Sequence, residues 1–220
     1  MNKIRPNADR AKYAIAAMYS MIVLELAAFG YQYYVSTITL FDTVEDYDAF
    51  FQLSVIFIIV VSVLSILAAI VFIMWFRRAY YNLHQIVPTG LRYTEGWASG
   101  AWFIPVFNLW GPYQIAADLF KRTEGLLVNE NLIEAKPVRF QIMGWWWGIW
   151  IASSVFSRID ARMEDIILPI AALSAILGIA AALLAVKMIQ SYHEMEVLLP
   201  KLSDSRVTDV NSDDLLDSGM

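Results

Sequence analysis

An acidic residue in the middle of a long apolar stretch is the first group in the sequence that could carry chemistry. Glu25 lies inside an apolar run that extends from Tyr13 to Leu40. A carboxyl group at the depth of lipid hydrocarbon is costly, and such groups commonly carry protons or bind cations. The alternative is a structural role, in which a protonated or hydrogen-bonded carboxyl faces a serine, tyrosine or tryptophan of the helix bundle. No second charged residue lies deep in an apolar run, which favours the structural role.

The segment from Arg92 to Gln114 is the second candidate, because it is apolar and aromatic but interrupted by prolines. No charged residue falls between Glu95 and Asp118. The residues that set this segment apart are Arg92, Gly96, Trp97, Gly100, Trp102, Pro105, Asn108 and Pro112. By length and hydropathy the segment could cross a membrane, but its prolines argue against one straight helix.

The two prolines predict a broken helical hairpin in this part of the chain. We expect two short helical pieces, at about 96–104 and 110–128, with Asn108 capping the second piece and Pro112 in its first turn. In transporters, the ends of such half-helices face a bound ligand. The alternative is a capped turn that only shapes the hairpin. Because no inverted repeat is visible in the sequence, the structural turn is favoured.

Other classes of site lack the residues that they need. The sequence holds no cysteine and two histidines, His84 and His193, so thiolate chemistry is excluded and a histidine-rich metal site is not expected. Neither histidine has an evident nucleophile partner, and Gly96-x-x-x-Gly100 lacks the Gly-Lys-Ser/Thr of a phosphate loop. No compact basic motif indicates nucleic-acid binding. We therefore expect no catalytic residues, no cofactor and no metal.

The composition is that of a membrane protein. Hydrophobic residues make up 59% of the 220 residues and charged residues 17%, whereas soluble domains average about 45–50% and about 25%. We predict an all-α membrane protein with four transmembrane helices, at about 13–40, 50–76, 139–157 and 166–187, in a single polytopic domain over 1–199. The broken segment and the amphipathic helix after it form the hairpin, at about 96–128. Residues 200–220 are polar and acidic and are expected to be a disordered tail.

The distribution of lysine and arginine predicts the topology. Cations favour the cytoplasmic side of short loops. If the hairpin does not span the membrane, 14 of the 16 cations lie on the side of both termini, and Arg158 and Arg162 lie on the other. If the hairpin spans, the division is 9 against 7. We therefore expect a re-entrant or interfacial hairpin that faces the cytoplasm and packs against the spans, because non-helical backbone at membrane depth must be buried in protein or reach water.

Two stripes of small residues offer faces for helix packing. One stripe is Gly144, Gly148 and Ala152, and the other is Ser174, Gly178 and Ala182. Small residues at every fourth position let helix backbones approach closely. We expect both stripes to lie in helix contacts, with a contact between the two stripes as one option.

Four features of the sequence occur together in a known family. They are Trp75-Phe-Arg-Arg-Ala-Tyr-Tyr-Asn-Leu at the end of the second span, the Arg92–Gln114 segment, Trp145-Trp-Trp-x-x-Trp150, and the alanine-rich last span. In these features the chain from about Phe50 to Leu199 resembles the bacterial integral membrane proteins of domain of unknown function 4328. The resemblance implies a membrane protein with no established activity or cofactor, and it leaves the first span outside. It departs at Gly111, where the family usually carries a basic residue, so we do not expect this position to bind an anion.

The unusual residues concentrate in the hairpin, and no catalytic group lies there. We therefore expect a non-enzymatic membrane module that binds a protein partner or lipid through its cytoplasmic hairpin. The alternative is a small transporter or channel that uses Glu25 and the break around Pro105 and Asn108. The expected partners are membrane lipids and a membrane or cytoplasmic protein, with a second copy of the chain as a further option. The expected location is a bacterial cytoplasmic membrane, with multiple spans and both termini in the cytoplasm.

Reporter fusions test this topology. Fusions after residues 45, 90, 130, 162 and 210 are expected to report outside, inside, inside, outside and inside, because this order keeps most cations in the cytoplasm. The measurement combines a reporter that is active only outside the membrane with one that is active only in the cytoplasm. A fusion after residue 130 that reports outside would show that the hairpin crosses the membrane.

Overall fold

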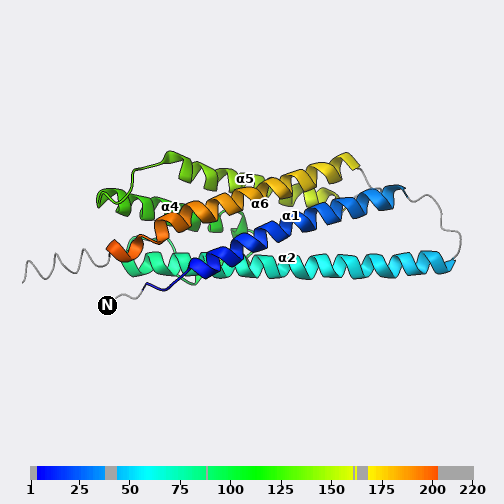
Figure 1. Ribbon diagram of the computed structural model, residues 1–220, viewed down its shortest axis with the longest axis horizontal. Helices are drawn as coiled ribbons and strands as arrows, with labels where there is room; N and C mark the ends of the chain where they lie inside the picture. The colour runs from blue at the N-terminus through cyan, green and yellow to red at the C-terminus, as the bar shows by residue number, and fades with distance from the viewer. Residues whose placement is uncertain (1–3, 38–43, 88, 161, 163–167, 203–220) are drawn as a thin grey trace, which may run out of the picture. The chain divides into compact units, whose positions relative to one another are not determined.

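A computed structural model describes residues 4–37, 44–87, 89–160, 162 and 168–202 of the chain. The described residues form α1 (Ala8–Thr37), α2 (Val44–Ile86), α3 (Trp97–Gly100), a 3-10 turn η1 (Phe107–Leu109), α4 (Gly111–Asn129), α5 (Pro137–Asp160) and α6 (Leu168–Glu196). Figure 1 follows these helices in colour along the chain. No strand occurs among the described residues, which confirms the all-α prediction. Most of the predicted tail, from residue 203 onward, lies outside them.

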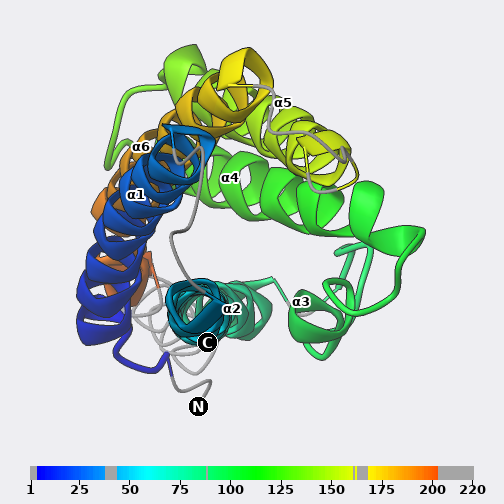
Figure 2. The same cartoon turned by 90° about the vertical axis from the view of Figure 1, so that its right-hand side faces the viewer.

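The breaks between helices fall where glycine and proline predict them. α2 continues past Arg78 to Ile86, and the chain then turns at Gly90, whose φ is 85°. Glycine adopts this conformation without the steric cost that a side chain adds. Pro112 lies in the first turn of α4, as predicted. Figure 2 shows the chain leaving α2, turning through α3 and entering α4.

Three helices among the described residues are long and apolar enough to cross a membrane. They are α1, residues 46–86 of α2, and α6 with the residues that follow it to Leu202. The 24-residue α5, where the sequence predicts a span at 139–157, does not belong to this group. Its tryptophans have amphipathic rings that suit an interface. Arg139 in its first turn pairs with Glu124 of α4 at 3.0 Å.

The helices divide into two compact units. Unit 1 contains residues 1–12, 73–144 and 188–220, and unit 2 contains 13–72 and 145–187. α1, α2, α5 and α6 each contribute to both units, because each is apolar along most of its length and polar at one end. The hairpin belongs to unit 1, and the most apolar stretches of the long helices belong to unit 2.

Unit 2 presents large apolar side chains outward and buries small ones. Leu53 and Ile66 of α2 are 67% and 60% exposed, which suits a lipid solvent. The buried side chains on α6 here are largely alanines, at positions 171, 175, 181, 182 and 185. Small residues of this kind let helices approach within van der Waals range, which is the main source of helix association in lipid.

The side chain of Glu25 in α1 packs directly against Gly178 in α6. A Cβ atom built on Gly178 would lie 2.6 Å from Oε1 of Glu25, so the glycine leaves the space that the carboxyl group occupies. The stripe on α6 therefore lies in a helix contact, as predicted, and Ser174 of the same stripe also bonds to Ser157 of α5 at 3.2 Å.

The stripe on α5 does not behave as predicted at its glycines. A Cβ atom on Gly144 or Gly148 would meet no other described atom within 4 Å, and Gly148 is exposed. The expectation that both glycines lie in close helix contacts is therefore wrong. Small residues permit a close approach but do not require one.

Unit 1 has an aromatic core. The largest fully buried side chains are Trp75, Tyr80, Tyr192, Phe76 and Phe120, which come from α2, α4 and α6. Tyr192 lies between two of them, with ring-centre distances of 6.2 Å to Trp75 and 5.5 Å to Phe120. Edge-on and tilted arrangements of this kind add to the stabilisation that burial alone provides.

A buried carboxylate ties three segments of unit 1 together. Glu196 of α6 is 5% exposed and accepts hydrogen bonds from Nδ2 of Asn7, at 3.0 Å to each oxygen, and from Nδ2 of Asn82, at 2.8 Å. Asn82 also bonds to both backbone groups of Arg5, at 3.0 and 2.9 Å. The segment before α1 is thereby fixed to α2 and α6, and the buried acid has amide partners that offset its desolvation.

Substitution of Gly178 tests the packing of Glu25. Gly178→Leu is expected to lower the free energy of unfolding by about 1–3 kcal/mol, because the new side chain overlaps the Glu25 carboxyl. Leucine is preferred to alanine because a flexible carboxyl can swing away from one methyl group. The measurement is thermal unfolding in detergent.

Two further variants serve as controls for this substitution. Gly148→Leu introduces the same side chain on an exposed glycine and should leave the unfolding temperature unchanged. Glu25→Ala combined with Gly178→Leu should recover part of the loss, because the carboxyl is gone. Equal losses from Gly148→Leu and Gly178→Leu would show that Glu25 does not occupy this space.

Candidate functional site

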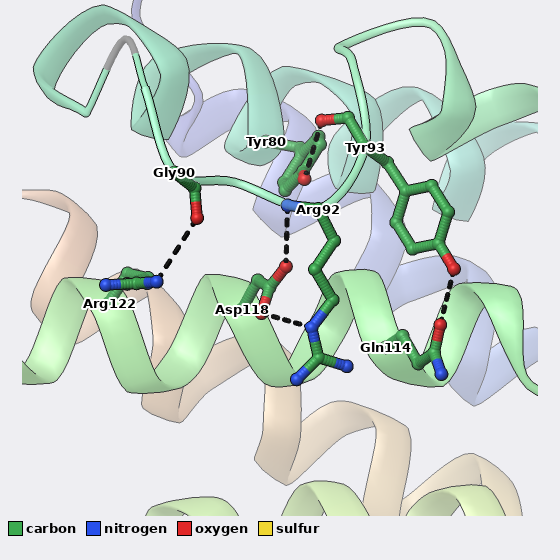
Figure 3. Close-up of polar contacts among 7 residues, drawn as sticks. All are labelled: Tyr80, Gly90, Arg92, Tyr93, Gln114, Asp118 and Arg122. Atoms are coloured by element: carbon green, nitrogen blue, oxygen red, sulfur yellow. Dashed lines mark hydrogen bonds and ion pairs between the residues drawn. The ribbon is translucent and has the colours of Figure 1, made fainter.

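The first part of the candidate site fixes the chain that leads from α2 into the hairpin. Arg92 donates its backbone N–H to Oδ2 of Asp118 at 3.3 Å, and its Nε lies 3.5 Å from Oδ1 of the same carboxylate (Figure 3). Asp118 lies on the buried face of α4, and its side chain is 10% exposed. One carboxylate therefore holds both the backbone and the side chain of Arg92.

Tyr93, the next residue, bonds to both α2 and α4. Its carbonyl accepts a hydrogen bond from the hydroxyl of Tyr80 at 3.0 Å and contacts Nε2 of His84 at 3.1 Å. Its own hydroxyl bonds to Oε1 of Gln114 in α4, as Figure 3 shows. Arg122 adds a bond from Nη2 to the carbonyl of Gly90 at 3.1 Å. These bonds fix residues 90–93 to both α2 and α4.

The break itself is a turn of buried alanines and aromatic rings. Ala98 and Ala101 are fully buried, and the ring of Trp102 packs edge-on against Phe76 with centres 6.0 Å apart. Trp102 also donates from Nε1 to the carbonyl of Ala98 at 3.2 Å. Pro105 follows α3 in the turn, where it has no backbone N–H to donate.

Four aromatic rings from both sides of the break at Pro105 form a cluster. Phe107 is the central one, with its ring centre 5.1 Å from Trp97, 5.6 Å from Tyr93 and 5.8 Å from Trp110. The ring of Phe107 also occupies the space in which a Cβ of Gly111 would stand. A long basic side chain at position 111 would have to displace this ring.

The hairpin tip is apolar and exposed. We define the tip as Phe103, Ile104, Val106, Leu109 and Trp110. Phe103 is 73% exposed and Val106 is 65% exposed. A rigid loop that projects large apolar side chains is typical of a surface that contacts lipid or another protein.

The part of the chain that carries this site matches a known family. A family model described as domain of unknown function (DUF4328) matches residues 39–194, which include the whole hairpin. The chain belongs to the DUF4328 family. The match begins after α1, so all but the last two residues of the first predicted span, 13–40, lie outside it, as the resemblance implies. No curated protein and no solved structure matches the sequence.

The structure of this DUF4328 chain brings some predicted site residues together and separates others. The contact of Asp118 with Arg92, which we call the staple, holds the start of the hairpin. Trp97 packs against Phe107 and Trp102 against Phe76, and Pro112 lies in the first turn of α4. Gly96 and Gly100 border open space, because a Cβ on either would meet no described atom within 4 Å. Glu25 belongs to unit 2, whereas the hairpin belongs to unit 1.

The capping role predicted for Asn108 is wrong. The residue before α4 is Trp110, and no side chain caps the helix there. Asn108 instead lies inside η1, where its backbone N–H bonds to the carbonyl of Ile104 at 2.7 Å. Its Oδ1 is buried and has no hydrogen-bond partner in the part of the chain that the structure describes. The 3-10 turn after Pro105 moves the start of α4 beyond the reach of this side chain.

The sequence prediction missed Tyr80 and Gln114 as part of the site. The two acids that bound the uncharged stretch both form ion pairs, Asp118 with Arg92 and Glu95 with Arg77 at 3.7 Å. Tyr80 follows the charged end of the apolar stretch of α2, where a continued helix must bury one face. That helical continuation is the signal that could have found it. Among the described residues no cluster of acidic and histidine side chains has a metal-binding arrangement.

Removal of the Asp118 carboxylate tests the staple that holds the hairpin. Asp118→Ala is expected to destabilise the 90–93 connection by about 1 kcal/mol, because Arg92 is partly solvated but its backbone N–H loses an acceptor. Cleavage by trypsin after Arg92 in detergent-solubilised protein should then be about five-fold faster. Asp118→Asn keeps one acceptor and should lie between the two.

The matched control is Glu130→Ala, which removes an exposed carboxylate at the C-terminal end of the same helix. This variant should be cleaved after Arg92 at the rate of the unmodified chain. If Asp118→Ala and Glu130→Ala are cleaved equally fast, Asp118 does not hold the hairpin.

Proposed function

We propose that the chain is a non-enzymatic membrane module that binds lipid or a protein partner through the tip of its hairpin. The observation that carries the proposal is the tip itself, because Phe103 and Val106 are largely exposed on a loop whose preceding residues, 90–93, are bonded to α2 and α4. Fixing a loop in its bound shape lowers the ordering entropy that binding costs. The Arg92–Asp118 staple and the aromatic packing around Phe107 can both restrict the shape of the loop in this way.

The proposed topology has four spans, at 13–40, 50–76, 139–157 and 166–187, with both termini and the hairpin in the cytoplasm of a bacterium. α5 supports a fourth span by its length, since 24 residues of helix extend about 36 Å, and a bilayer core is about 30 Å thick. The charge distribution along the loops supports the orientation. In this arrangement the tip meets the cytoplasmic leaflet or a protein that lies within it.

Binding through the tip is favoured over transport through the break at Pro105. The aromatic rings of Trp97, Phe107 and Trp110 pack against one another beside this break. Half-helix ends that bind an ion need backbone groups turned toward a cavity. A transport role for Glu25 stays a prediction from the sequence.

Site-specific photocrosslinking tests the proposal. A benzophenone amino acid at Val106 is expected to form adducts with phospholipid or with one discrete protein in native membranes, because the tip is then in contact with it. The readout is mass spectrometry of the adducts. Lipid adducts identify an interfacial hairpin, and a single protein adduct identifies a partner.

The control places the same amino acid at Asn129, an exposed residue at the end of α4. Asn129 should give no lipid adduct and no discrete protein adduct. If Val106 gives the same products as Asn129, the tip faces water and the proposal is wrong.

A further inference from the structure

Three arginines gather at one place in unit 1, away from the hairpin tip. The guanidinium carbon of Arg5 lies 4.4 Å from the ring centre of Tyr81, and that of Arg78 lies 6.0 Å from the same ring. Arg10 donates from Nη1 to the carbonyl of Met74, one helical turn before Arg78, at 3.1 Å. Arg5 and Arg10 each repel the charge of Arg78. The fold thus brings together like charges from two distant parts of the chain.

The nearby carboxylates of the described residues are engaged elsewhere. Glu95, which attracts Arg78 at longer range, forms its ion pair with Arg77. Asp9 lies 4.0 Å from Lys12, and its side chain is 85% exposed. Glu196 is buried, attracts Arg78 at longer range and accepts its hydrogen bonds from two asparagines, so it offsets only part of the charge of the three arginines. The cluster therefore retains an excess of positive charge.

The position of Arg5 is built into the fold. Asn82, which is 1% exposed, binds the backbone N–H and the backbone carbonyl of Arg5 with two separate hydrogen bonds. The same Asn82 donates to the buried carboxylate of Glu196. A cation on a free terminal segment would move away from like charges, whereas these bonds hold Arg5 beside Arg78.

The cluster follows the end of an apolar stretch of α2. The apolar stretch of α2 ends at Trp75 and Phe76, and Arg77 and Arg78 follow at once. Tryptophan and arginine in this order mark the boundary between hydrocarbon and headgroups. The abundant anion at that depth is the phosphate of a phospholipid, and the planar fork of arginine matches phosphate oxygens in two-point contacts.

We propose that Arg5, Arg10 and Arg78 form a binding site for the phosphate of an anionic phospholipid. The site does not use the hairpin tip, so it stands or falls separately from the function proposed above. Arg5 is exposed and Arg78 half-buried, which leaves both guanidinium groups accessible to a headgroup. Both guanidinium groups lie over the ring of Tyr81, and the ring face attracts each cation.

The test measures binding of phosphatidylglycerol and phosphatidylcholine to the purified full-length chain by native mass spectrometry. Each cluster arginine is replaced by glutamine in turn, giving Arg5→Gln, Arg10→Gln and Arg78→Gln. Each variant is expected to bind phosphatidylglycerol about ten-fold more weakly, because it loses one charge-assisted contact. The controls are Lys12→Gln and Lys121→Gln, which remove the same charge from exposed positions outside the cluster and should change binding less than two-fold. Circular dichroism of each variant verifies that the helices are retained.

Three results would overturn the proposal. If the two control variants weaken binding as much as the three cluster variants, only total charge matters. If phosphatidylcholine binds as tightly as phosphatidylglycerol, the site does not select an anionic lipid. If glycerol phosphate at equal concentration displaces the lipid completely, the site binds soluble phosphate. Replacing Val106 with serine at the hairpin tip should leave all of these results unchanged.

Discussion

Unit 1 depends on one buried carboxylate and the amides that face it. Glu196 has two asparagine donors, Asn7 and Asn82, and these come from the segment before α1 and from α2. A buried acid without donors would oppose folding, whereas this one makes three chain segments mutually dependent. The same residues position the arginine cluster, because Asn82 also forms hydrogen bonds with the backbone of Arg5.

The two units are stabilised by different physical means. Unit 2 relies on small residues and close backbone approach, as at Gly178, and leaves its large apolar side chains exposed. Unit 1 buries large aromatic rings such as Trp75 and Tyr192 and satisfies its polar groups with specific hydrogen bonds. The contrast matches the solvents expected around each part, with lipid for the apolar stretches and water or headgroups for the polar helix ends.

Hydropathy and the helix breakers predicted the long helices, the interruption of helix around Pro105 and the place of Pro112, whereas the first helical piece expected at 96–104 is helical only over Trp97–Gly100. The sequence could not predict the partners of Glu196 or of Tyr93, because those residues lie far apart in the chain and meet only after it folds. Asn108 shows the limit of local rules. It has the right residue type for a cap, but the turn after Pro105 starts α4 later than its side chain can reach.

The sequence separation of the Asn7–Glu196 pair is 189 residues, which has a consequence for how the chain is made. The donor, Asn7, precedes α1 and is synthesised before the long helices, whereas the acceptor, Glu196, is the last residue of α6. Contacts that close so long a loop form late, after local helices are in place. A nascent chain interrupted before residue 196 therefore carries Asn7 and Asn82 without the carboxyl acceptor that joins the two amides in the folded chain.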